Sequence, residues 1–137
     1  MDINYLAIAV ATVAQFFIGA AYYTFVFGKT WGELHDFDKN SPEVKKEMAS
    51  KMGPFYGIQL VVTIFSSVVL ALFITHTTGY SPYVLALMLW IGFIVPTQYS
   101  DVVFGGTQAD RIVKKLAIVA GGSLLCILVA AAILQAF

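Results

Sequence analysis

Charged side chains are scarce in this sequence and absent from long parts of it. Only 12% of the 137 residues are Asp, Glu, Lys or Arg, whereas 59% are hydrophobic. Soluble domains carry a charge on about a quarter of their residues. No charged side chain occurs in residues 3–27, 53–100 or 116–137. Because a soluble fold needs a solvated polar face, runs of this length exclude an ordinary soluble domain and indicate an integral membrane protein.

Cysteine and histidine are also nearly absent, and this excludes several kinds of site. Cys126 is the only cysteine, so an internal disulfide and a thiolate metal cluster are excluded. His35 lies beside acidic residues but has no clear further metal ligand. Motifs for phosphate loops, nucleophile elbows, zinc and haem attachment are missing. We therefore expect no metal, no cofactor and no enzymatic activity. Nucleic acid is not an expected partner, because acidic residues balance the basic ones.

The apolar sequence divides into four segments, each long enough to cross a hydrocarbon core of about 30 Å. We expect these transmembrane helices at about residues 3–27, 54–76, 82–104 and 112–136, within a single membrane domain over residues 1–137. The fold class is therefore all-α, a polytopic membrane protein whose four helices form a bundle.

Three local signals refine this expected bundle. Gly28 is expected to end the first helix in a left-handed cap, and Pro96 is expected to kink the third. Ser41 followed by Pro42 is typical of a helix start. This start signal is followed by apolar residues at every fourth position. Together they predict a short amphipathic helix over residues 42–51 that lies on the membrane surface.

The basic residues predict the orientation of the bundle. Five lysines lie between the first and second spans, and Arg111, Lys114 and Lys115 lie between the third and fourth. The remaining loop and both termini have no lysine or arginine. By the positive-inside rule, the loops over residues 28–53 and 105–111 are cytoplasmic and both termini lie outside. The lipid bilayer is thus the first expected partner.

Two patterns along the helices concern packing and duplication. Gly19, Gly121, Gly122 and Cys126 belong to rows of small residues, which permit close helix packing within one chain or between copies. The stretch from Val26 to Thr30 also resembles residues 103–107, and both stretches end helices of the same direction. The chain is therefore either two repeated helix hairpins or a single bundle whose interfacial sequences have converged.

The same stretches resemble a known family. Residues 19–31, with paired aromatics and the ending FGKTW, and residues 90–104, followed by Lys114 and a glycine-bearing last helix, resemble an uncharacterised bacterial membrane family, domain of unknown function family 1761. This chain departs from the family pattern by having Tyr22-Tyr23 in place of a tryptophan-tyrosine pair, and an acid at Asp101. The resemblance implies a four-helix fold and a bacterial inner-membrane location, but no activity.

A group of polar side chains within the spans forms the candidate site. Asp101 is the most prominent, because an unpaired charge within a span costs at least a few kcal/mol and often marks function. At its depth it either has a functional role or reaches headgroup water, Arg111 or Lys114. The other candidates line a polar crevice or serve as interhelical hydrogen-bond partners; these candidates are Gln98, Thr97, Gln15, Tyr22 and Gln59.

Three functional hypotheses follow. The first is a non-catalytic module that associates with itself or is an accessory subunit of a larger membrane complex, so a homo-oligomer or such a complex is an expected partner. The alternative is an oligomeric transporter or channel for a small solute or proton that uses Asp101 and the kink at Pro96. A membrane enzyme acting on lipid is the weakest of the hypotheses, since no paired acids or metal spacing support it.

Overall fold

A computed structural model of the chain describes residues 2–137, and these residues form helices with no strand. Four helical segments are long and apolar enough to cross a membrane. They are α1 (Tyr5–Ala21) with η1 (Tyr22–Val26), α4 (Gly53–His76), α5 (Pro82–Leu89) with η3 (Trp90–Ile94) and α6 (Val95–Phe104), and α7 (Ile112–Ala136) with its leading turn η4 (Ala109–Arg111). The protein is therefore an all-α, multi-pass membrane protein.

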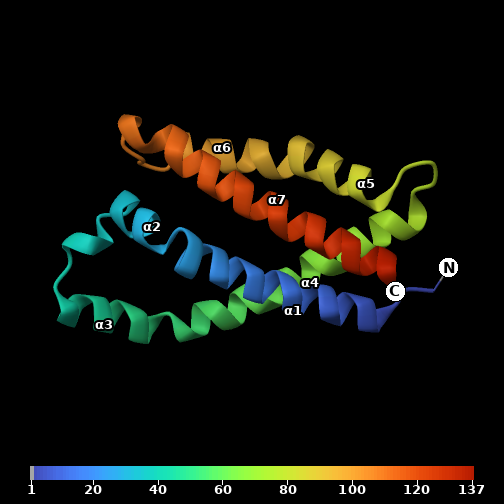
Figure 1. Ribbon diagram of the computed structural model, residues 1–137, viewed down its shortest axis with the longest axis horizontal. Helices are drawn as coiled ribbons and strands as arrows, with labels where there is room; N and C mark the ends of the chain where they lie inside the picture. The colour runs from blue at the N-terminus through green and yellow to red at the C-terminus, as the bar shows by residue number, and fades with distance from the viewer. Residues whose placement is uncertain (1) are drawn as a thin grey trace.

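Shorter helices join the spans at one end of the molecule. They are α2 (Gly28–Leu34), η2 (Phe37–Lys39) and α3 (Pro42–Lys51). Figure 1 shows these helices and the turn between α6 and α7 at one end, which we call the basic end, and both termini at the opposite end. The termini are adjacent there, because the Asn4 amide donates to the carbonyl of Phe137 at 3.5 Å.

The first span ends differently from the sequence-based expectation. Tyr22–Val26 forms a π-helical turn, in which the amide of Phe27 donates to the carbonyl of Tyr22. Gly28 then begins α2, and its backbone is not left-handed. The prediction of a glycine cap at Gly28 is wrong, because the wide turn and the bend at Phe27 (φ −118°) redirect the chain without needing a left-handed residue.

The third span has a second π-helical turn directly before its proline. Ser81 caps its start, accepting a hydrogen bond from the amide of Val84. At Trp90–Ile94 the backbone hydrogen bonds span five residues rather than the four of an α-helix, and the Val95 amide donates to the carbonyl of Trp90. Proline removes an amide donor and crowds the preceding turn. A π-helical turn is one way in which a helix accommodates such a disturbance, so the irregularity near Pro96 takes this form.

The amphipathic segment forms the helix α3. Ser41 caps it by accepting a hydrogen bond from the amide of Val44 at 3.3 Å, and Pro42 occupies its first turn. The side chains of Val44, Met48 and Met52 are all exposed on its surface. Such a face suits contact with the membrane surface.

The tightest packing lies toward the end of the bundle that carries the termini. Its core contains small and aliphatic side chains, namely Ala11, Leu70, Ala86, Ile127, Ala130 and Ala131. Since lipid tails are as apolar as leucine, van der Waals contact between closely approaching helices holds such a bundle together. No residue from Gly53 to Val62 is buried, so the basic half of α4 takes almost no part in this core.

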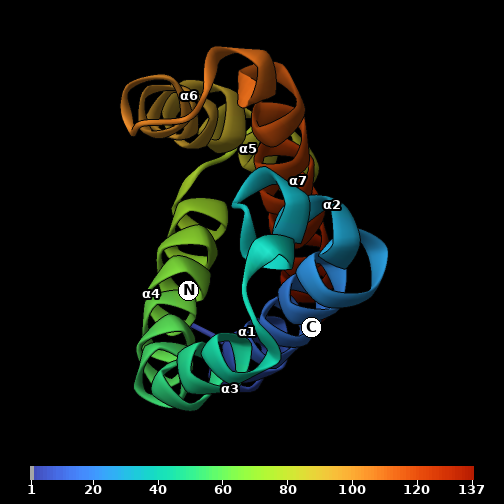
Figure 2. The ribbon, with the colours of Figure 1, turned by 90° about the vertical axis from the view of Figure 1, so that its left-hand side faces the viewer.

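The two hairpins do not pack in equivalent ways. α1 packs along α7, while α4 makes few contacts with α5. Figure 2 shows α4 standing apart from α6 at the basic end, with α1 and α7 on the other side. The π-turns also differ in position: Tyr22, which aligns with Tyr99, starts the first, whereas the second ends at Ile94. The duplication of the hairpin stays a prediction.

Candidate functional site: a lateral cleft between the hairpins

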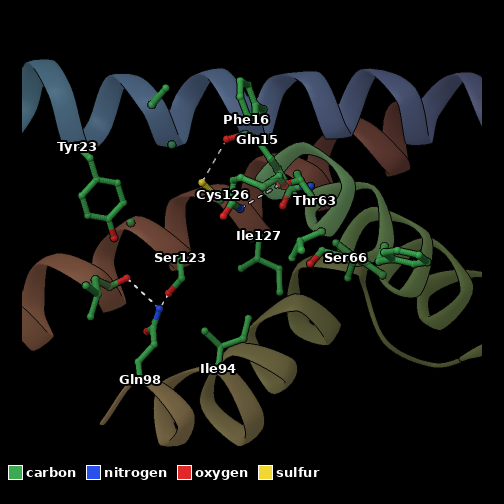
Figure 3. Close-up of a pocket in the computed structure, with 18 of the residues that line it drawn as sticks. Gln15, Phe16, Tyr23, Thr63, Ser66, Ile94, Gln98, Ser123, Cys126 and Ile127 are labelled. Carbon is green, nitrogen blue, oxygen red and sulfur yellow. Dashed lines mark hydrogen bonds between the residues drawn. The ribbon is translucent and has the colours of Figure 1, made fainter. Parts of the chain in front are cut away.

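A cavity of about 1010 Å³ lies where the two hairpins separate. We call it the lateral cleft. Its walls come from α1, α4, α7 and the third span, and most of them are apolar. Figure 3 shows several polar side chains that face the cleft from different helices. The polar residues in the wall of the cleft include Gln15, Gln59, Thr63, Ser66, Gln98 and Ser123.

Gln15 joins α1 to α4 at the inner wall of the cleft. Its amide nitrogen donates to Ser67 Oγ at 2.8 Å, and Thr12 Oγ1 lies 3.0 Å from the same oxygen. Ser67 is fully buried and its hydroxyl lies 3.0 Å from the carbonyl of Thr63. These bonds satisfy polar groups that would otherwise be costly in a hydrocarbon environment.

Gln98 makes a matching connection from α6 to α7. Its amide nitrogen donates to the carbonyl of Val119 at 3.3 Å, and its oxygen lies 3.2 Å from the hydroxyl of Ser123. Ser123 also accepts a hydrogen bond from the indole of Trp90 at 3.1 Å. The pair Trp90–Ser123 was not predicted from the sequence. The signal for it is a tryptophan deep within a span, because its indole N–H needs an acceptor there.

Gln59 lies on the outer wall of the cleft, on the exposed half of α4. Its amide nitrogen lies 3.3 Å from Thr63 Oγ1 on its own helix. No side chain of another helix bonds to it within residues 2–137. Gln59 therefore differs from Gln15 and Gln98: it faces the cleft without connecting two helices.

Tyr22 and the predicted small residues lie together at the seam between α1 and α7. The Tyr22 hydroxyl donates to the carbonyl of Ile118 at 2.7 Å. A methyl group on Gly122 would meet a Tyr22 ring carbon at 2.8 Å, and one on Gly121 would meet the Tyr22 oxygen at 3.0 Å. At Gly19 it would meet Cys126 Sγ at 3.9 Å. This row thus packs against its own chain.

Asp101 and Thr97 lie outside the cleft. Both are exposed and neither contributes to its wall. Thr97 bonds back to the carbonyl of Phe93 on its own helix at 2.7 Å. Asp101 forms no ion pair within residues 2–137, and Arg111 pairs with Asp36 instead. The structure therefore separates the predicted site into the three glutamines at the cleft, Tyr22 at a packing seam, and Asp101 with Thr97 on an outer surface.

A second polar region lies at the basic end. Arg111 donates from Nη1 to the carbonyl of Leu34 and to Asp36 Oδ1, both at 3.1 Å, and Lys39 Nζ lies 3.2 Å from the same carboxylate oxygen. The hydrogen bond from Lys39, followed by that from Arg111, lowers the pKa of Asp36 below its ordinary value. Asp36 has a left-handed backbone, with φ of 55°, which Asp tolerates better than most residues.

The polar groups of the lateral cleft are amides and hydroxyls rather than a cluster of metal ligands. Within residues 2–137, no three His, Cys, Asp or Glu side chains lie close enough to hold a metal ion together. The hydrogen bonds across the cleft join amides and hydroxyls to one another and to backbone carbonyls. This arrangement can fix helices relative to each other and can receive an apolar group that has a polar edge.

Comparison with protein-family models supports the resemblance inferred from sequence. A family model described as a protein of unknown function (DUF1761) matches residues 6–135, which is nearly the whole chain. No curated protein and no solved structure matches the chain.

Proposed function

Because the chain belongs to the DUF1761 family, whose description gives no activity, we propose a function from the geometry: a non-catalytic membrane module that associates with a second copy of itself. The open lateral cleft, with α4 as its poorly packed outer wall, supports this proposal. Membership in a larger complex as an accessory subunit is the related possibility that the same experiment distinguishes.

The exposed half of α4 has the features of a helix that packs against another helix. Gly53 and Gly57 are four residues apart, and a methyl group added to either would meet no atom within 4 Å. Glycines at this spacing let two membrane helices approach closely. Gln59 follows one half-turn later and faces the cleft. Half a turn of helix places Gln59 on the side of α4 opposite to the glycines, so a second helix packed on the glycine face would bury Gly53 and Gly57 and leave Gln59 to the cleft.

A second copy is the occupant that this geometry favours. In a twofold dimer the same surface serves both partners, so the glycine face of α4 in one copy would lie against the glycine face of α4 in the other. Gly19, Gly121 and Gly122 pack within the chain, between the first and fourth spans, which leaves the glycines of α4 for contact between chains.

Replacement of Gly57 by leucine tests this interface. The added side chain meets nothing within the monomer, so folding is unaffected, but it blocks close approach of two helices. Energy transfer between labelled copies in liposomes measures the fraction of dimer. We expect the variant to need about tenfold more protein than the wild type to reach the same fraction, which corresponds to a loss of about 1.4 kcal/mol in the free energy of dimerisation. Gly92→Leu is the matched control, since Gly92 also has open space around it but lies on the third span.

Two outcomes contradict self-association through α4. One is a wild-type protein that stays monomeric in liposomes at every protein density. The other is an equal effect of Gly57→Leu and Gly92→Leu. A third outcome is that the protein purifies from native membranes together with a fixed proportion of another protein, and that only Gly57→Leu loses this partner. This outcome assigns the same surface to an accessory role instead.

We further propose that the module resides in a bacterial inner membrane with both termini outside. All eight lysine and arginine residues lie in residues 29–51 or 111–115, at the basic end, and positive residues favour the cytoplasmic side. Fusion of alkaline phosphatase to residue 137 tests this orientation: enzymatic activity in the periplasm is expected, and an inactive but stable fusion contradicts it.

Transport of a small solute is the second candidate, and the size of the lateral cleft favours it. The cleft contains amides and hydroxyls that suit a neutral polar solute, whereas Asp101 lies outside it. A solute flux in liposomes that is lost in Gln98→Leu and retained in Asp101→Asn would support this candidate. The reverse result would restore the proton-linked form of the hypothesis.

A further inference from the structure

A small crevice lies at the basic end, separate from the lateral cleft. Its volume is about 250 Å³, roughly eight times the share of one water molecule in the liquid. We call it the basic crevice. The end of α2 forms one wall and the turn between α6 and α7 forms the other. The residues on which its chemistry depends are His35, Gly105, Gly106, Thr107, Arg111 and Lys115.

The turn that forms this wall presents backbone donors. Gly105 has φ −87° and ψ 20°, and Gly106 has φ +86°. Successive amides in a right-handed and then a left-handed conformation form a concave nest that binds anions. The amide of Gly106 donates to no backbone carbonyl outside the helices, and Gly106 lines the crevice.

The crevice also carries unused positive charge. Lys115 Nζ lies 6.0 Å from the centre of the Trp31 ring and pairs with no carboxylate within residues 2–137. Arg111 uses only Nη1 for its bonds to Leu34 and Asp36, so Nη2 and Nε keep their donors. Asp36, the one acid in the wall, is already paired with both Arg111 and Lys39. The local balance therefore favours an anion.

Thr107 supplies an independent sign of a missing partner. Its hydroxyl oxygen is buried and has no hydrogen-bond partner, and within residues 2–137 it is the only buried side-chain nitrogen or oxygen atom in this state. Such an atom costs about 1–3 kcal/mol. It belongs to the residue that follows the nest and lines the crevice.

We propose that the basic crevice binds a phosphate group, held by the amides of the glycine turn, by the hydroxyl of Thr107 and by the side chains of Lys115 and Arg111. The crevice adjoins the ends of the third span at Phe104 and of the fourth at Ile112, which is the depth of lipid headgroups. The phosphate therefore comes from an anionic phospholipid or from a free phosphate. This site does not depend on association through α4.

The test uses the full chain and a conservative set of variants. Lys115→Gln removes the unpaired charge and leaves the Arg111 tether in place. Thr107→Val replaces a hydroxyl that bonds to nothing, so folding is unharmed while the polar wall is lost. Lys114→Gln is the matched control, because it makes the same charge change one residue away, and Lys114 is outside the crevice. Native mass spectrometry counts phosphatidylglycerol molecules that remain bound after purification from vesicles containing phosphatidylglycerol and phosphatidylcholine.

We expect one retained phosphatidylglycerol in the wild type and in Lys114→Gln, and at least a tenfold weaker retention in Lys115→Gln and Thr107→Val. If phosphatidylglycerol is not retained but inorganic phosphate, added to protein in phosphatidylcholine nanodiscs, binds with the same dependence on Lys115, the site is assigned to a free phosphate. Equal losses in Lys114→Gln and Lys115→Gln, or no saturable binding of either probe, overturn the proposal.

Discussion

The seam between α1 and α7 gives a prediction whose size follows from three distances. A methyl group on Gly122 would lie 2.8 and 3.1 Å from two carbons of the Tyr22 ring and 3.2 Å from the Tyr23 hydroxyl oxygen. The first distance is shorter than real contacts allow. The Tyr22 ring has little freedom to move, since its hydroxyl donates to the carbonyl of Ile118 at 2.7 Å and the ring packs 4.8 Å from that of Phe27.

Gly122→Ala therefore has opposing effects. Overpacking costs about 1–3 kcal/mol, and displacement of Tyr22 loses an interhelical hydrogen bond worth about 0.6 kcal/mol. Replacing glycine by alanine within a helix stabilises the helix by up to about 1 kcal/mol. The net expectation is a loss of about 1–2 kcal/mol in the free energy of unfolding.

Unfolding by sodium dodecyl sulfate in mixed micelles, followed by circular dichroism, measures this loss. Gly92→Ala is the control, because its methyl group meets nothing within 4 Å, and it is expected to leave stability unchanged or to raise it. Tyr22→Phe separates the hydrogen bond from the packing. A Gly122→Ala protein as stable as Gly92→Ala would show that the seam between α1 and α7 is looser than described, and would refute the argument.

Two further predictions concern polar contacts. The lowered pKa of Asp36 means that its pairing with Lys39 and Arg111 stabilises the fold above the ordinary pKa of aspartate, about 4, and that this stabilisation is lost as the pH falls through the lowered value. Asp36→Asn is expected to flatten the fall in thermal stability below about pH 4, whereas Asp38→Asn is not; identical profiles for the two variants would contradict the pairing. Ser67→Ala removes a fully buried acceptor and is expected to lower the free energy of unfolding by about 0.5–1.5 kcal/mol in the same micelle assay. Ser66→Ala, at an exposed position, is expected to cause no measurable change. Equal effects of the two variants would contradict the hydrogen bond from α1 to α4.

The sequence predicted what depends on one segment at a time. The absence of charge over residues 53–100 determines the existence and approximate length of two spans, and Ser41 with Pro42 determines the start of α3. The bend after Tyr22 was not predicted from the sequence. A π-helical turn arises from the hydrogen-bond pattern that packing against α7 selects, and FFIGAAYYTFVFGKTW has no proline to indicate one.

The candidate site was predicted less well than the spans, for a related reason. Asp101 attracted attention because charge is rare in this chain, but rarity does not fix the face of a helix that a residue occupies. Gln15 and Gln98 lie at the cleft because Ser67, Val119 and Ser123 face them from other helices. Those partnerships join residues from distant parts of the sequence, and no pattern within a single helix encodes them.

The glycines of α7 and of α4 have different surroundings. On α7, Gly121 and Gly122 face α1, so these two helices approach closely along the basic half of the bundle. On α4, Gly53 and Gly57 face open space, and neither lines the lateral cleft. Since close approach is what holds membrane helices together, the glycines of α7 contribute to packing within the chain, whereas those of α4 leave a face that suits close packing of a helix from a partner.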